Sequence, residues 1–255
     1  MKIPKSRVGQ FLSIAVLFIC SGAFSASSLL VWPIYQIIEA NNNSSALWLE
    51  NKGNNTVGLQ IRIMTWRQMQ YEDRYADQTE VIPTPPFIKL EPGQRSMIRL
   101  MRVAPPSTTQ ERAFRIVIDE IATPFLPQTS NAPSGVQFQM RYLLPLFLRG
   151  TGNDKPNISA PPLQLHWRIA PVNGKPYLYV RNEGQTHARL NNVFWSTSPQ
   201  GKGSRTIISE GFLGYVLPGQ EMRWPLPASA AAPGANAILY THLTDAPDPV
   251  VITRG

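Results

Sequence analysis

The residues that most often carry catalytic chemistry are sparse and dispersed in this sequence. Its three histidines, His166, His187 and His242, are far apart and form no pair with metal-ligand spacing. Asp119 and Glu120 are adjacent, so on a strand they would point to opposite faces and could not act on one substrate as an acid and base pair. No serine lies in a nucleophile elbow, and no glycine loop precedes a helix. The sequence therefore predicts a protein that is not an enzyme and has neither a metal nor a cofactor.

The only cysteine, Cys20, lies in an N-terminal segment with the order of a signal peptide. Residues 1–10 carry three basic residues and no acid, residues 11–20 are apolar, and the small residues SGAFSA follow. Neither this apolar run nor any later one is long enough to span a bilayer stably. Residues 1–26 are therefore predicted to be a signal peptide, cleaved after Ser25 or the next residue. The exported chain would have no cysteine, so packing rather than disulfides must stabilise it.

The charge balance is basic but moderate. Lysine and arginine number 24 and the acidic residues number 16, and the charges are dispersed rather than gathered in runs. Nucleic acid is not expected as the partner of an exported protein with this pattern. An acidic polypeptide or a carboxylate is the better expectation.

Apolar and polar residues alternate along most of the remaining chain, which is typical of β-strands. Turn-forming stretches such as EPGQ and APPSTTQE separate the alternating segments. The clearest of these segments in the first half are residues 45–51, 57–66, 96–103, 112–121 and 136–148. A polar stretch with Gly and Pro at 149–162 is typical of a linker. The sequence predicts an all-β protein with two β-sandwich domains, residues 27–149 and 150–255.

The segment TPPFIKLEPGQRSMIRL, residues 84–100, combines this pattern with basic residues. Its Pro-Gly pair fits the centre of a tight turn, because Pro pre-sets φ and Gly tolerates a positive φ. Arg95, Arg99 and Arg102 alternate with core-type residues, so they are expected to line one outer face of a sheet. There they would meet a polypeptide partner.

The strand at 136–148 has an unusual apolar face. Val136, Phe138, Met140 and Tyr142 share that face, because side chains alternate along a strand. An ordinary half-buried strand would also show this pattern. However, the strand is long and follows a loop rich in small and polar residues, and an exposed apolar ladder is what strand addition to a partner requires.

At this point the sequence resembles a known family. TPPFIKLEPGQRSMIRL, FRIVIDEI and MRYLLPLFLR are similar, in order and spacing, to the first domain of periplasmic chaperones of the chaperone–usher pathway, the PapD-like family. The resemblance implies two immunoglobulin-like domains set at an angle, with a cleft that binds pilus subunits. It implies donor-strand complementation, with Val136, Phe138 and Met140 on the donated face. It also implies delivery of the subunit to an outer-membrane usher, with no stable membrane insertion.

The family fixes its interdomain angle with a buried triad of two acids and a base. By position, the resemblance implies that Glu120, Arg149 and Asp245 form this triad. A guanidinium can bind two carboxylates at once, which suits an orienting role. Three independent surface charges are the alternative.

The sequence departs from the family at the two basic residues that hold the subunit's terminal carboxylate. Those positions are occupied by Tyr35 and Pro145, neither of which carries a positive charge. Arg115 is the first replacement candidate, with Arg102 and Arg141 behind it. Absence of the usual pair is typical of the divergent archaic branch. The alternative for Arg115 is an ordinary pair with a surface acid.

Two other functional classes remain open from the sequence. A structural or adhesive β-sandwich subunit of the surface fibre would need an unpaired N-terminal extension, and SSLLVWPIYQII alternates in part. Two complete domains and a long internal strand argue against it. A secreted sugar-binding module would need clustered aromatic residues, whereas the six tryptophans are spread along the predicted strands.

Overall fold

The computed structural model describes residues 29–107, 110–121, 139–151, 164–231, 233–243 and 248–255. The predicted signal peptide, Val136, Phe138 and Asp245 lie outside the described residues. The described part is all-β, apart from one 3-10 helix, η3 (Ala228–Ala230). None of its helices has the length and apolar character needed to cross a bilayer.

Domain 1 contains ten strands, β1 to β10, in two sheets. A four-stranded sheet has the order β1-β3-β8-β6, and a second sheet has the order β2-β10-β9-β4-β5, with β7 also paired to β4. The strands are β1 (Leu29–Trp32), β2 (Gln36–Ile38), β3 (Ser44–Asn51), β4 (Val57–Met69), β5 (Glu72–Ala76), β6 (Val81–Thr84), β7 (Phe87–Leu90), β8 (Arg95–Arg102), β9 (Arg112–Ile121) and β10 (Arg141–Leu148).

The core of domain 1 lies between these two sheets. Alternate residues of β4, such as Leu59 and Ile61, are buried against Ile98 and Leu100 of β8. Burying each such side chain stabilises the fold by roughly 1.5–3 kcal/mol. The period-2 pattern seen in the sequence therefore corresponds to inward-facing residues.

The EPGQ turn connects the two sheets of domain 1. Gly93 has φ 74°, which favours glycine, and it lies between β7 in one sheet and β8 in the other.

Arg95 and Arg99 face outward on β8, as predicted, and are exposed. The prediction is wrong for Arg102, which shares its face with the core residues Ile98 and Leu100 and is buried. The physical reason is parity, because Arg102 follows Leu100 by two residues.

Domain 2 is a seven-stranded sheet folded around a second core. Its strand order is β14-β13-β16-β17-β11-β12-β15. Its strands are β11 (Leu165–Val172), β12 (Lys175–Asn182), β13 (Ala188–Ser196), β14 (Arg205–Val216), β15 (Glu221–Pro225), β16 (Ile238–His242) and β17 (Val250–Arg254).

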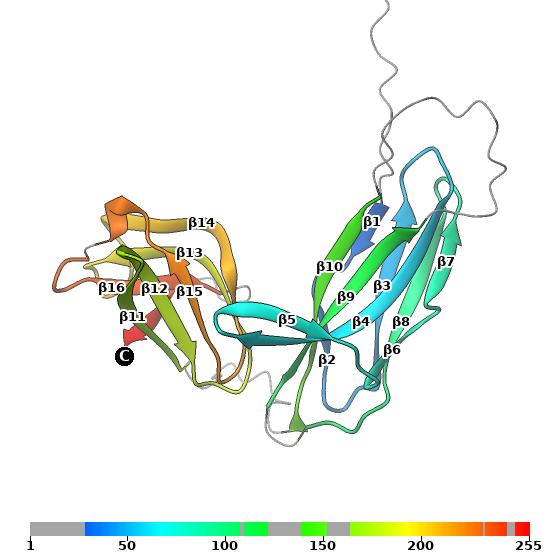
Figure 1. The fold of residues 1–255 in the computed structure, drawn as a ribbon, viewed down its shortest axis with the longest axis horizontal. Helices are drawn as coiled ribbons and strands as arrows, with labels where there is room; N and C mark the ends of the chain where they lie inside the picture. Colours follow the sequence, from blue (N-terminus) through cyan, green and yellow to red (C-terminus); the bar gives the residue numbers. More distant parts are fainter. Residues whose placement is uncertain (1–28, 108–109, 122–138, 152–163, 232, 244–247) are drawn as a thin grey trace, which may run out of the picture.

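The two domains lie at an angle, and the β4–β5 hairpin extends from domain 1 toward domain 2 (Figure 1). They share a third apolar cluster, in which Trp66 and Phe147 of domain 1 pack with Tyr215 and Leu217 of domain 2. The two-domain all-β sandwich predicted from the sequence is confirmed.

Candidate functional site

Strand β10 is paired along its length on one edge only. Residues 141–148 all pair with β9, whereas the short strand β2 covers just 146–148 on the other edge. Among the described residues, no strand pairs with that second edge of 141–145. An open edge offers backbone donors and acceptors that another strand can use, although Pro145 has no N–H to donate.

The two ends of the predicted apolar ladder differ in exposure. Tyr142 packs against the core of domain 1, together with Leu144 on the same face of β10. Burial, and then the charge of Glu120, raise the pKa of the Tyr142 hydroxyl above its usual value. Met140, two residues earlier, is 42% exposed. Domain 1 therefore covers the Tyr142 end of this face with its own core and leaves Met140 open.

Arg115 lies in the middle of β9 on the face toward domain 2. It is directly opposite Pro145 in the register, so it neighbours the position of a missing family cation on the same sheet face. Its guanidinium stacks 3.6 Å from the Trp66 ring centroid and lies 5.6 Å from that of Tyr215.

The hydrogen-bonding capacity of Arg115 is not used up by its surroundings. Its ion pair with Asp73 is long, at 3.7 Å, and its side chain is 12% exposed. Among the described residues, its buried Nε has no acceptor. A buried donor without an acceptor is costly, so this guanidinium favours an additional acceptor.

Arg141, the third anchor candidate, has a different environment. Its Nε donates to Asp119, which also accepts a 2.7 Å hydrogen bond from Arg62. Burial alone would raise the pKa of Asp119, but the hydrogen bonds and charges of the two arginines outweigh it and hold that pKa below its usual value. Arg141 is 62% exposed at its side chain and lies at the far end of β10 from the domain junction.

Arg102, the second candidate, holds the chain of its own domain. Its guanidinium donates to the carbonyl oxygens of Ile38 at 2.8 Å, Arg149 at 3.2 Å and Ala40 at 3.4 Å. These contacts join the ends of β2 and β10. Arg102 is buried and its Nη atoms donate to backbone carbonyls, so it does not face outward as predicted. Its role as a subunit anchor stays a prediction.

The structure corrects the predicted triad. Glu120 lies next to Met140, whose carbonyl accepts a hydrogen bond from the Glu120 backbone N–H. Arg149 follows the opposite end of β10, where Leu148 pairs with Arg112. Because β9 and β10 are antiparallel, Glu120 and Arg149 are separated by the length of the ladder, roughly 30 Å.

The acid that meets Arg149 is Glu111, just before β9. Arg149 Nη1 lies 3.4 Å from one Glu111 carboxylate oxygen, and His187 Nδ1 of domain 2 lies 2.6 Å from the other. The backbone N–H of His187 also donates to Glu111, at 3.0 Å. The Tyr35 hydroxyl lies 3.0 Å from Nε2 of His187. An acid, a base and a histidine thus join the domains.

Sequence reasoning missed both Glu111 and His187. Antiparallel pairing of 112–121 with 141–148 predicts that residue 111 meets residue 149, and this signal was available. No local pattern marks His187, whose ring stacks 3.6 Å from that of Phe147 at an interplanar angle of 4°. Its role depends on how domain 2 packs.

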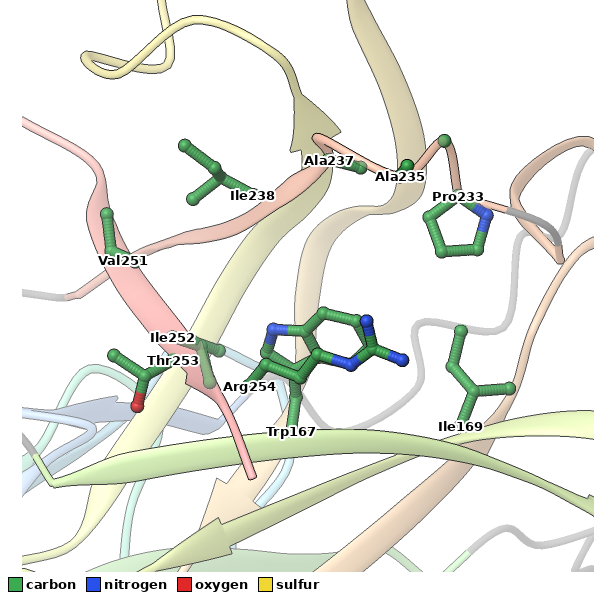
Figure 2. Close-up of a pocket in the computed structure, with 11 residues that line it drawn as sticks. Trp167, Ile169, Pro233, Ala235, Ala237, Ile238, Val251, Ile252, Thr253 and Arg254 are labelled. Atoms are coloured by element: carbon green, nitrogen blue, oxygen red, sulfur yellow. The ribbon is translucent and has the colours of Figure 1, made fainter.

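A hollow in domain 2 is separate from this junction. Strands β11 and β17 pair at His166 and Trp167, opposite Thr253 and Arg254, where β17 ends. Figure 2 shows Trp167 and Arg254 at the centre of the hollow. Among the described residues that line it, the other side chains are apolar or small, except Thr253, and Arg254 carries the only charge.

Comparison with known proteins identifies the family. A chain in the crystal structure of the CsuC–CsuE chaperone–tip adhesion subunit pre-assembly complex, from the archaic chaperone-usher Csu pili of Acinetobacter baumannii, is 32% identical. The match covers 89% of this chain and 99% of that chain, with a TM-score of 0.68. The chain belongs to the pilus-assembly chaperone family. Residues 34–153 also match the family model described as pili and flagellar-assembly chaperone, PapD N-terminal domain.

More distant pilus chaperones show the same fold. The E. coli chaperone DraB is 17% identical, with a TM-score of 0.58 over 86% of this chain and 92% of that chain. A chain in the structure of Salmonella enterica SafA pilin in complex with the SafB chaperone is 16% identical, with a TM-score of 0.58 over 91% and 98% of the two chains. No curated protein matches the chain.

Membership confirms the resemblance found in the sequence. Chaperones of this family are periplasmic and are not enzymes. The similar Csu structure comes from an archaic pathway, in agreement with the predicted branch. The alternative of a fibre subunit belongs to a different class of protein and is not favoured.

Proposed function

We propose that this chaperone captures pilus subunits by donating β10 and the residues before it as a missing strand. The observation that carries the proposal is the open edge of residues 141–145 beside the exposed Met140. Backbone hydrogen bonds along such an edge give affinity, and alternate side chains fill pockets of the partner.

The apolar ladder then has two parts. Val136, Phe138 and Met140 enter the groove of the subunit, and each buried side chain contributes roughly 1.5–3 kcal/mol. Tyr142 packs on domain 1 and holds the base of the donated strand in place. The donated strand is thereby fixed at one end and accessible at the other.

Arg115 anchors the carboxylate at the subunit's C-terminus. It neighbours Pro145, is stacked on Trp66 and has unused hydrogen-bonding capacity. Its face is the one that meets domain 2, so the subunit terminus would enter between the domains. The chaperone, exported by its signal peptide, then delivers the subunit to an outer-membrane usher.

The test is capture of a pilus subunit encoded by a neighbouring gene, after co-expression and purification of a one-to-one complex. Met140→Asp should weaken capture by at least tenfold, since about 1.4 kcal/mol corresponds to that factor. Gln139→Asp is the matched control, because it adds the same charge on the opposite face of the strand. Equal capture by both variants would contradict the proposed donor face.

A further inference from the structure

The tip of the β4–β5 hairpin has an unfavourable sequence for its turn. Met69 pairs with Glu72, so Gln70 and Tyr71 form a two-residue turn, with φ 54° and 67°. Turns of this kind favour Asn and Gly, because both central residues need a positive φ. A bulky residue in this conformation is an outlier that persists only where its surroundings hold it.

Domain 2 supplies the surroundings that hold Tyr71. Its ring meets Tyr179 of β12 edge-on, with centroids 5.4 Å apart. The Arg223 guanidinium of β15 lies 4.4 Å from the Tyr71 centroid, and its Nη1 donates to the Tyr179 hydroxyl at 3.3 Å. The side chain therefore makes interdomain contacts that Asn or Gly could not make.

The same hairpin contacts domain 2 at a second point. The buried amide of Gln68 donates to the carbonyl of Tyr215 at 3.0 Å and accepts from the N–H of Leu217 at 2.8 Å. Gln68 lies two residues before the tip of the hairpin and Tyr71 lies at the tip, so they are separated by roughly 7 Å along the hairpin. The Gln68 contacts and the Glu111–His187 pair reach domain 2 around Tyr215 and His187, whose ring centroids lie 5.8 Å apart. Tyr71 reaches domain 2 at a separate point, and a second separate point restricts rotation of domain 2 about the first.

We infer that Tyr71 is an interdomain latch, a positioning residue that fixes the angle between the domains. Its unfavourable turn conformation is retained because the ring must reach Tyr179 and Arg223. Through domain 2, the latch also fixes Tyr215 beside Arg115. This consequence for subunit capture rests on the proposed function, whereas the latch itself is a property of the free chaperone.

The test measures the distance between spin labels on the two domains of the free, full chaperone. Lys89 of β7 and Thr206 of β14 are exposed and can be replaced by Cys, with Cys20 replaced by Ser. Tyr71→Asn removes the ring at a position where Asn tolerates a positive φ. Gln70→Asn is the matched control in the same turn, and Tyr71→Phe keeps the ring.

The expected result is a single narrow distance in the parent chain, Gln70→Asn and Tyr71→Phe, and loss of that narrow distance in Tyr71→Asn. The melting temperature of domain 1 should not fall in Tyr71→Asn, because the turn is relieved. Subunit capture by Tyr71→Asn should weaken by up to about fivefold to sixtyfold, the factor that corresponds to the loss of one aromatic and one cation–π contact. An unchanged distance in Tyr71→Asn would overturn the latch, even if Met140→Asp still abolished capture.

Discussion

The two ends of the β9–β10 ladder contain similar residue types in different environments. At the domain junction, Glu111 is fully buried at its side chain between Arg149 and His187. At the far end, Asp119 lies between Arg62 and Arg141, whose side chains are 44% and 62% exposed. Each end has one acid between two basic groups.

Burial decides what each cluster does. A charge buried at the junction is costly to leave without its partners, so Glu111 constrains how the domains join. Exposed ion pairs contribute little to stability, so the Asp119 cluster constrains the fold less than Glu111 does. Arg115 lies between the two ends and combines partial burial with a buried Nε that has no acceptor among the described residues.

The largest effect is expected at Arg102, whose guanidinium holds three carbonyls at the junction end. Arg102→Met should lower the free energy of unfolding by about 3–5 kcal/mol, because buried acceptors lose charged donors. Urea unfolding followed by tryptophan fluorescence measures this change. Arg99→Met, on the exposed face of the same strand, is the control and should be nearly neutral. Equal effects would remove the distinction between the two faces of β8.

A smaller loss is expected from Glu111→Gln, by about 2–3 kcal/mol, because His187 and Arg149 lose the charge between them. The melting temperature measures it, and a double-mutant cycle with His187→Gln isolates the interdomain part. Glu120→Gln, at the other end of β9, should leave the melting temperature nearly unchanged. A larger fall in melting temperature for Glu120→Gln than for Glu111→Gln would support the triad predicted from the sequence.

The Arg115→Ala variant should weaken binding rather than folding. A charge-assisted hydrogen bond to the subunit's terminal carboxylate contributes about 1.5–3 kcal/mol, or roughly tenfold to a hundredfold in affinity. Titration of the chaperone with a subunit measures it. Amidating the subunit's C-terminus should cause a similar loss, and the two losses should not add. If Arg115→Ala binds the subunit as tightly as the parent protein, a different residue must bind the terminal carboxylate.

The smallest effect is expected in the pH dependence of stability, through Asp119 at the end of the β9–β10 ladder away from the domain junction. The folded pKa of Asp119 lies below its unfolded value of about 3.9, so its contribution is full above that pH and is lost as the pH falls through the folded pKa. Asp119→Asn should therefore flatten the decline of melting temperature in acid. Measurements from about pH 6 to about pH 3 test this. Asp77→Asn, at an exposed aspartate, should leave the decline as it is.

The positions of several proposed site residues could be predicted from the sequence because they depend on local spacing. Met140 is exposed on the predicted ladder face, and Arg115 lies on the face toward domain 2, opposite Pro145. Arg102 was predicted to face outward, although its spacing from Leu100 already indicates an inward position. Contacts between residues on different strands were harder to predict, because the sequence of one strand does not show its register with another.

The sequence by itself determined most of the long strands, the turn at Gly93, the two-domain division and the absence of cysteine after residue 20. These follow from period-2 alternation and from backbone preferences, which are local. Only the tertiary structure decided that Arg149 meets Glu111 and His187, and that Tyr71 meets Tyr179. Those contacts depend on antiparallel register and on the packing of one domain against another. Both bring together residues distant in the chain, which the pattern of a single strand does not record.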